Sequence, residues 1–197
     1  MTVIGITGPT GAGKTTVLNV LEEMGGAAAD CDQVYHGLLR TSAPLQAELR
    51  ARFGGKIFAE NGGLRRKELG AIVFEDPQAL ADLNAVTHRH IIAELKRLIE
   101  RARAENRPAI ALDAIALIES GAAELCDVTI AVTAPEDVRV GRIMAREGIS
   151  EAYARARVRA QKPGSWFEEH CTYTLRNNGD RAGFEARARS LLTQILD

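Results

Sequence analysis

The segment from Gly8 to Thr15 constrains the fold of this chain more than any other feature. Its residues read Gly-Pro-Thr-Gly-Ala-Gly-Lys-Thr and match the pattern G-x-x-x-x-G-K-[ST] of a phosphate-binding loop. An apolar run at 3–7 predicts a buried strand before the loop, and residues 16–23 predict a helix after it. The alternative is a Gly-rich strand–helix turn that matches by chance, but the lysine, the hydroxyl and the order of the elements together favour the phosphate loop.

Such a loop holds a nucleotide largely through its backbone. Glycines let the chain fold tightly around a polyphosphate, and N–H groups of the loop and of the following helix donate to the anion. We expect Lys14 to reach the β- and γ-phosphates and the Thr15 hydroxyl to join a Mg²⁺ shell. The loop residues expected to bind ATP are Gly11, Ala12, Gly13, Lys14, Thr15 and Thr16.

Composition excludes several other classes of protein. The 197 residues suffice for one α/β domain with a modest insertion, and the formal net charge of −1 creates no general attraction to nucleic acid or acidic membranes. No apolar run approaches the roughly 20 residues of a membrane span, and the first strand leaves no room for a signal peptide. The three cysteines, Cys31, Cys126 and Cys171, are widely spaced and indicate reduced thiols. We therefore expect a cytoplasmic protein that binds neither nucleic acid nor membranes.

Strand and helix patterns alternate along the rest of the chain. Further strands are predicted at 27–30, 109–113, 127–132 and 173–177, and a closing helix at 185–196. With a phosphate loop after the first strand, this order predicts a three-layer α/β/α sandwich of the P-loop NTPase type with a five-stranded parallel sheet.

A polar, helix-rich segment interrupts this alternation from about 33 to 107. It is broken at Pro44 and Pro77, contains a turn at Asn61-Gly62-Gly63, and is most strongly helical at 93–105. We expect it to form an insertion between the second and third strands.

Ligands of open parallel sheets bind beyond the carboxyl ends of the strands. This rule brings Lys14, Asp30, Asp32 and Asp113 to one edge, although they are far apart in sequence. A carboxylate of Asp30-Cys31-Asp32 could accept the proton of a substrate hydroxyl and help to place Mg²⁺. It could equally cap a helix that starts near Gln33, and the local sequence does not separate the two interpretations.

Arginines cluster on two predicted helices joined by a glycine turn. Arg142 and Arg146 lie four residues apart on one face, and Ser150 is a natural N-cap for a second helix that carries Arg155, Arg157 and Arg159. These helices resemble a lid whose arginines neutralise the phosphates and exclude water. The alternative is a solvated basic face with Glu147 and Glu151 as partners; the phosphate loop favours the lid.

Together these residues resemble the dephospho-CoA kinase family from Ile4 to about Gly179. The opening pattern of that family is matched by Ile4 to Thr15, and its D-A-D by Asp30-Cys31-Asp32. Further matches are Phe53-Gly54, Leu64 to Leu69, Val73 to Pro77, the lid residues Arg142, Arg146, Ala154, Arg157, Ala160 and Gln161, and Asn177-Asn178-Gly179. The phosphate loop is common to many families, so the D-x-D, the V-F-x-D-P segment and the lid spacing carry the specificity.

The resemblance implies transfer of the γ-phosphoryl group of ATP to the ribose 3′-hydroxyl of dephospho-CoA, with Mg²⁺. It implies that Asp32 is the base and a metal ligand, that Lys14 and Arg142 are catalytic, and that Arg146 and Asn177 contact ATP. Acceptor contacts would come from Asp30, Arg66, His88 and Asp113. The nucleotide-binding core would comprise 1–32 and 108–197 with a lid at about 139–165, and 33–107 would bind the acceptor. We expect a monomer.

Two other functions fit the same residues less well. One is another P-loop small-molecule kinase, such as a nucleoside monophosphate kinase, which needs an arginine arrangement for a second phosphate that we do not find. The other is an ATP-binding module without catalysis, against which Asp32 and the lid arginines argue. The absence of N-K-x-D disfavours a GTPase.

Overall fold

A computed structural model of the 197-residue chain describes residues 1–59 and 62–197. Asn61, the first residue of the predicted turn, lies outside the described residues. The chain divides into two compact units, one made of Met1–Asp30 with Ile99–Asp197 and the other of Cys31–Leu98.

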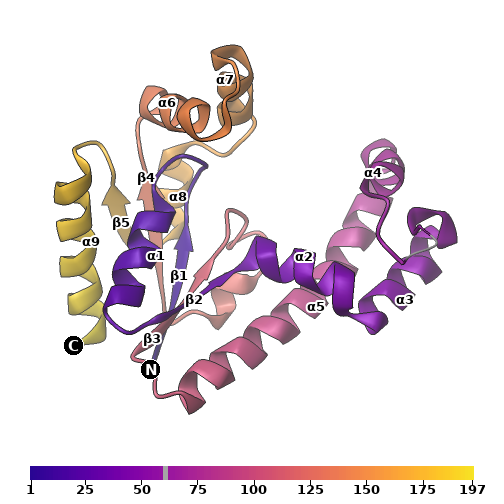
Figure 1. Cartoon of the computed structure of the whole chain (residues 1–197), viewed down its shortest axis with the longest axis horizontal. Helices are drawn as coiled ribbons and strands as arrows, with labels where there is room; N and C mark the ends of the chain where they lie inside the picture. Colours follow the sequence, from indigo (N-terminus) through magenta and orange to yellow (C-terminus); the bar gives the residue numbers. More distant parts are fainter. Residues whose placement is uncertain (60–61) are drawn as a thin grey trace. The chain divides into compact units, whose positions relative to one another are not determined.

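The first unit is built on a five-stranded sheet in the order β2-β3-β1-β4-β5 (Figure 1). All four strand pairs are parallel, as the alternation of strands and helices predicted. The strands are β1 (Thr2–Thr7), β2 (Ala27–Asp30), β3 (Ala109–Asp113), β4 (Val128–Thr133) and β5 (Tyr173–Arg176). Together with helices on the sheet, they form the predicted three-layer α/β fold of P-loop proteins.

The register of the sheet explains why its carboxyl edge collects polar residues. Asp113 lies opposite Ile6 of β1 on one side and opposite Asp30 of β2 on the other. The central strand β1 is apolar and almost entirely buried, because parallel strands are covered on both faces. Two aspartates therefore end neighbouring strands beside the point where the phosphate loop leaves β1.

The helices of the first unit are α1 (Lys14–Glu23), η2 (Ala122–Leu125), α6 (Glu136–Glu147), α7 (Glu151–Arg159), α8 (Gly164–His170) and α9 (Arg181–Leu196). Some of them pack against the sheet, whereas α6 and α7 bury their apolar residues against each other. α1 and α9 pack side by side, and their residues Val17, Leu21, Phe184 and Leu192 join the strands in one core (Figure 1). α8 packs on β4, and η2 contacts β1.

The second unit is helical and has its own core. Its elements are α2 (Cys31–Thr41), α3 (Ala43–Phe53), η1 (Gly55–Ile57), α4 (Arg66–Glu75) and α5 (Pro77–Ala104), whose last turns belong to the first unit. The core includes Leu39, Leu45, Leu49, Ile57 and Leu69. The helix predicted at 93–105 extends back to Pro77, since proline is well suited to a first helical turn. No helix in the described part of the chain is long and apolar enough to cross a membrane.

The turn from β1 into the phosphate loop requires glycine at position 8. Its φ of +138° is unfavourable for residues with a side chain, and a Cβ at this position would lie 2.0 Å from the carbonyl oxygen of Val132 on β4. The neighbouring strand therefore approaches the start of the loop too closely for any other residue.

We predict that Gly8→Ala lowers the free energy of unfolding by about 3 kcal/mol, because it combines backbone strain with a clash against main chain. Gly179→Ala is the matched control, since a Cβ there meets nothing within 4 Å. Urea denaturation followed by circular dichroism measures both. Equal stability of the two variants would contradict the close approach.

Candidate active site

The phosphate loop leads directly into α1. Gly13 precedes the helix with φ +108°, and no side chain in the described part of the chain caps the helix at this residue. A Cβ on Gly13 would lie 2.3 Å from the Asn177 side-chain nitrogen, so this position also requires glycine. The first N–H groups of α1 are thus arranged as in a helix N-terminus that binds an anion.

Two side chains from distant segments hold the loop carbonyls. Arg142 on α6 donates to the carbonyl oxygens of Gly11 at 3.2 Å and Ala12 at 3.3 Å. Asn177, which follows β5 and is 4% exposed, donates to the Ala12 oxygen at 2.8 Å and accepts from Arg142 at 3.1 Å. Because a trans peptide points its C=O and N–H in opposite directions, the Gly13 N–H is turned away from these donors.

Lys14 lies across the loop towards the edge of the sheet. Its ammonium donates to the Gly8 carbonyl at 3.1 Å and lies 4.0 Å from a carboxylate oxygen of Asp113. Asp30 stands opposite Asp113 in the sheet register. The structure therefore brings together three of the four residues predicted at this edge, all within the first unit.

Asp32 lies two residues beyond the end of β2, in the second unit. α2 begins at Cys31 rather than near Gln33, so Asp32 occupies the first helical turn, where its charge is favourable to the helix dipole. Its side chain is exposed.

Another contact network holds the tip of the loop. The Gln161 side chain accepts from the Thr10 N–H at 3.0 Å and donates to the Thr10 hydroxyl at 2.7 Å. Arg139 donates to the Thr10 carbonyl at 2.9 Å and to Gln161 at 2.8 Å, and it is only 5% exposed. Burial lowers the pKa of the Arg139 guanidinium, while the Glu136 carboxylate raises it. Thr10 is thus hydrogen-bonded to Arg139 in the first half of α6 and to Gln161 just after α7.

Three of the six lid arginines, Arg146, Arg155 and Arg157, are engaged with carboxylates. Ser150 caps α7 as predicted, accepting from the Tyr153 N–H. Arg146 pairs with Glu147 at 2.6 Å, and Arg157 contacts the other oxygen of the same carboxylate. Hydrogen bonds from these two arginines lower the pKa of Glu147. Arg142 faces the loop, whereas Arg146 and Arg157 show the solvated ion pairs of the alternative interpretation.

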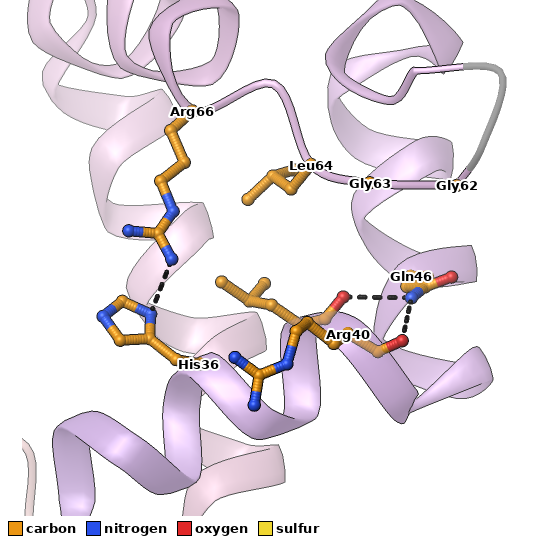
Figure 2. A pocket seen from close by; sticks show the side chains of 8 residues that line it. His36, Arg40, Gln46, Gly62, Gly63, Leu64 and Arg66 are labelled. Atoms are coloured by element: carbon orange, nitrogen blue, oxygen red, sulfur yellow. Dashed lines mark hydrogen bonds between the residues drawn. The ribbon is translucent and has the colours of Figure 1, made fainter.

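In the second unit, Arg66 begins α4 and donates to His36 Nδ1 on α2 at 3.2 Å (Figure 2). Both line a pocket of about 410 Å³ that also includes Arg40. His88 is half-buried on α5 and does not line this pocket. The structure thus separates the two acceptor contacts predicted in 33–107.

Comparison with known proteins decides the family. The dephospho-CoA kinase family model matches residues 2–182. A dephospho-CoA kinase of Corynebacterium diphtheriae is 34% identical over 191 residues, covering 97% of this chain and 96% of the relative. One from Moorella thermoacetica is 35% identical over 196 residues, covering 99% and 92%. The chain belongs to the dephospho-CoA kinase family.

Solved structures share the fold of this chain. A crystal structure from Thermus thermophilus matches with a TM-score of 0.80 and 32% identity, covering 98% of this chain and 97% of that one. A shikimate kinase from Bacteroides thetaiotaomicron, at 16% identity and TM-score 0.54, covers 98% of both chains and shares the fold. The family resemblance and the P-loop fold predicted from the sequence are confirmed.

The oxygen atoms near the phosphate loop suit Mg²⁺ that is bound together with a nucleotide better than a metal ion held by protein side chains alone. Within 1–59 and 62–197, no cluster of three or more His, Cys, Asp and Glu side chains could hold a metal ion. The oxygens at the loop are the Thr15 hydroxyl and the strand-end carboxylates. Mg²⁺ is commonly held by one or two such groups together with substrate phosphates and water, so these residues fit it.

Sequence reasoning did not assign the two residues that hold Thr10. Gln161 belongs to a matched family segment, and Arg139 lies three residues before Arg142, so that both arginines share one face of α6. The three-residue spacing of Arg139 and Arg142 was the sequence signal that could have identified Arg139 as a loop contact. Which backbone group each arginine reaches depends on the tertiary structure.

We predict that Gln161→Met lowers the free energy of unfolding by about 1–3 kcal/mol, because it leaves the Thr10 and Arg139 donors without their acceptor. Arg159→Met, at the exposed end of α7, is the control and should change stability by less than about 0.5 kcal/mol. Chemical denaturation of both variants checks this. A neutral Gln161→Met would show that the network contributes nothing to stability.

Proposed function

We propose that this chain is an ATP-dependent dephospho-CoA kinase, which transfers the γ-phosphoryl group of ATP to the ribose 3′-hydroxyl of dephospho-CoA. The products are coenzyme A and ADP. The observation that carries the proposal is the family match over residues 2–182, combined with a phosphate loop whose carbonyls are held by Arg142 and Asn177. We further propose that the protein acts as a monomer in the cytoplasm.

The nucleotide side of the reaction rests on the predicted core 1–32 and 108–197, which coincides with the first unit except at the segment borders, where Asp32 belongs to the second. Backbone groups of Gly11 to Gly13 and the first turn of α1, including Thr16, bind the ATP phosphates. Lys14 contacts the β- and γ-phosphates. Thr15 and Asp32 hold Mg²⁺, which neutralises phosphate charge when it is bound.

Within the lid, at about 139–165, arginines stabilise the charge of the transferring group. Arg142 is already anchored at the loop and acts there with Asn177. Arg146 exchanges its Glu147 partner for nucleotide phosphate. The exchange is feasible because Arg146 and Glu147 form an exposed pair, and such pairs are weak.

The acceptor side uses the carboxylates and the helical segment 33–107. Asp32, exposed in the first turn of α2, accepts the proton of the 3′-hydroxyl. Asp30 and Asp113 orient the ribose from the ends of β2 and β3. Arg66 and His88 contribute further acceptor contacts from α4 and α5.

We expect ATP-dependent ADP release with dephospho-CoA and none with AMP or CMP. A coupled assay with these three acceptors tests this directly. Turnover with a nucleoside monophosphate instead would indicate another P-loop kinase. ATP binding without turnover on any acceptor would indicate a binding module.

We predict that Lys14→Ala and Asp32→Asn each reduce turnover by a factor on the order of 10² or more. Lys14→Ala should also weaken ATP binding, whereas Asp32→Asn should leave it largely intact because the amide removes only the base. Steady-state kinetics and equilibrium ATP binding separate the two effects. Glu68→Gln, an exposed acid in the first turn of α4, is the control. Near-normal turnover by Asp32→Asn would refute its assignment as the base.

A further inference from the structure

One face of α2 carries a line of residues that starts at the proposed base. Asp32, His36 and Arg40 are spaced four residues apart, so they follow one another along the same side of the helix. The helical rise places His36 about 6 Å and Arg40 about 12 Å beyond Asp32 along the helix axis. All three belong to the same compact unit.

The far end of this line opens into the pocket of Figure 2. Its volume is about 410 Å³, within the range of small-molecule sites, and its lining is mostly polar: His36, Leu39, Arg40, Gln46, Gly62, Gly63, Leu64 and Arg66. These described lining residues include two arginines and a histidine but no carboxylate. The pocket is therefore positively charged.

Some arginines of the same unit have carboxylate partners, whereas Arg50, Arg65 and the two pocket arginines have none among the described residues. Arg52 and Arg89 are paired with Asp82 and Glu48. Arg40 and Arg66 form no ion pair with any carboxylate of the described residues, and Arg66 is hydrogen-bonded instead to Nδ1 of His36. Both side chains are exposed, so their charges are accessible to an anionic ligand.

The wall that carries Arg40 is held in place. The Gln46 amide donates to the carbonyl oxygens of Leu39 at 2.9 Å and Arg40 at 3.2 Å, which ties the last turn of α2 to α3. Leu39 itself is buried in the core of the unit. Arg40 thus extends from a backbone that is fixed by packing and by hydrogen bonds (Figure 2).

The geometry points to a subsite for the diphosphate group of the acceptor, formed by Arg40, Arg66 and His36. This inference rests on the proposed function. In dephospho-CoA the diphosphate begins one sugar ring away from the 3′-hydroxyl, a separation comparable to one or two turns of α2. With the hydroxyl at Asp32, the diphosphate reaches His36 and Arg40, and paired guanidinium groups suit phosphate oxygens.

The test compares wild type with Arg40→Ala, Arg66→Ala and Arg65→Ala. Arg65 is the matched control, because it neighbours Arg66, is exposed, and does not line the pocket. Calorimetric titration with dephospho-CoA, in the absence of ATP, measures binding by the full chain. Steady-state kinetics measure KM for dephospho-CoA and for ATP separately.

We expect Arg40→Ala and Arg66→Ala each to weaken dephospho-CoA binding and raise its KM about ten-fold, the effect of losing one charged hydrogen bond. The KM for ATP and the Arg65→Ala variant should remain as in wild type. Unchanged affinity in both pocket variants, or a rise in the KM for ATP alone, would overturn the subsite. If wild type binds dephospho-CoA through these arginines but does not turn it over, the subsite holds and the proposed kinase activity fails.

Discussion

The hydrogen bonds accepted by the Ala12 carbonyl are the constraint on which the nucleotide site depends. Their donors are Arg142 on α6 and Asn177 after β5, residues that only the folded sheet brings to the loop. They orient the following peptide, so the Gly13 N–H faces away from them, as in a loop that binds an anion. Such an orientation lets the loop stabilise phosphate charge without reorganising during the reaction.

The residues proposed to bind the acceptor are organised on a different principle. One helix face sets their spacing, with Asp32 in the first turn of α2 and Arg40 in its last. β2 ends at Asp30 and α2 begins at the next residue, so Asp32 is separated from the strand-end carboxylate by only one residue in the chain. A helix is a rigid support, which suits a site that must hold a reacting hydroxyl at one end and a charged group at the other.

The sequence predicted the parts of the fold that local patterns determine. The apolar run at 3–7, the phosphate loop and the Ser150 cap each have a short-range physical cause, and each is present in the structure. The start of α2 at Cys31 was missed, because an acidic residue suits both a cap and a first turn. The alternative interpretation correctly named Glu147 and Glu151 as partners, which pair with Arg146, Arg157 and Arg155. The loop carbonyls that Arg142 reaches could not be predicted, since helical spacing gives the face but not the tertiary neighbour.

The arginines of α6 illustrate that difference. Arg139 and Arg142 are three residues apart and both reach backbone of the loop, where buried donors must be satisfied. Arg146, one turn further, reaches only the exposed Glu147, an interaction that water and salt weaken. A phosphate group could therefore displace Glu147 from Arg146 at small cost, whereas displacing Arg142 would release the loop carbonyls that it holds. The same helix thus carries an arginine held by the loop backbone and one held only by an exposed ion pair, a difference that would suit the proposed lid.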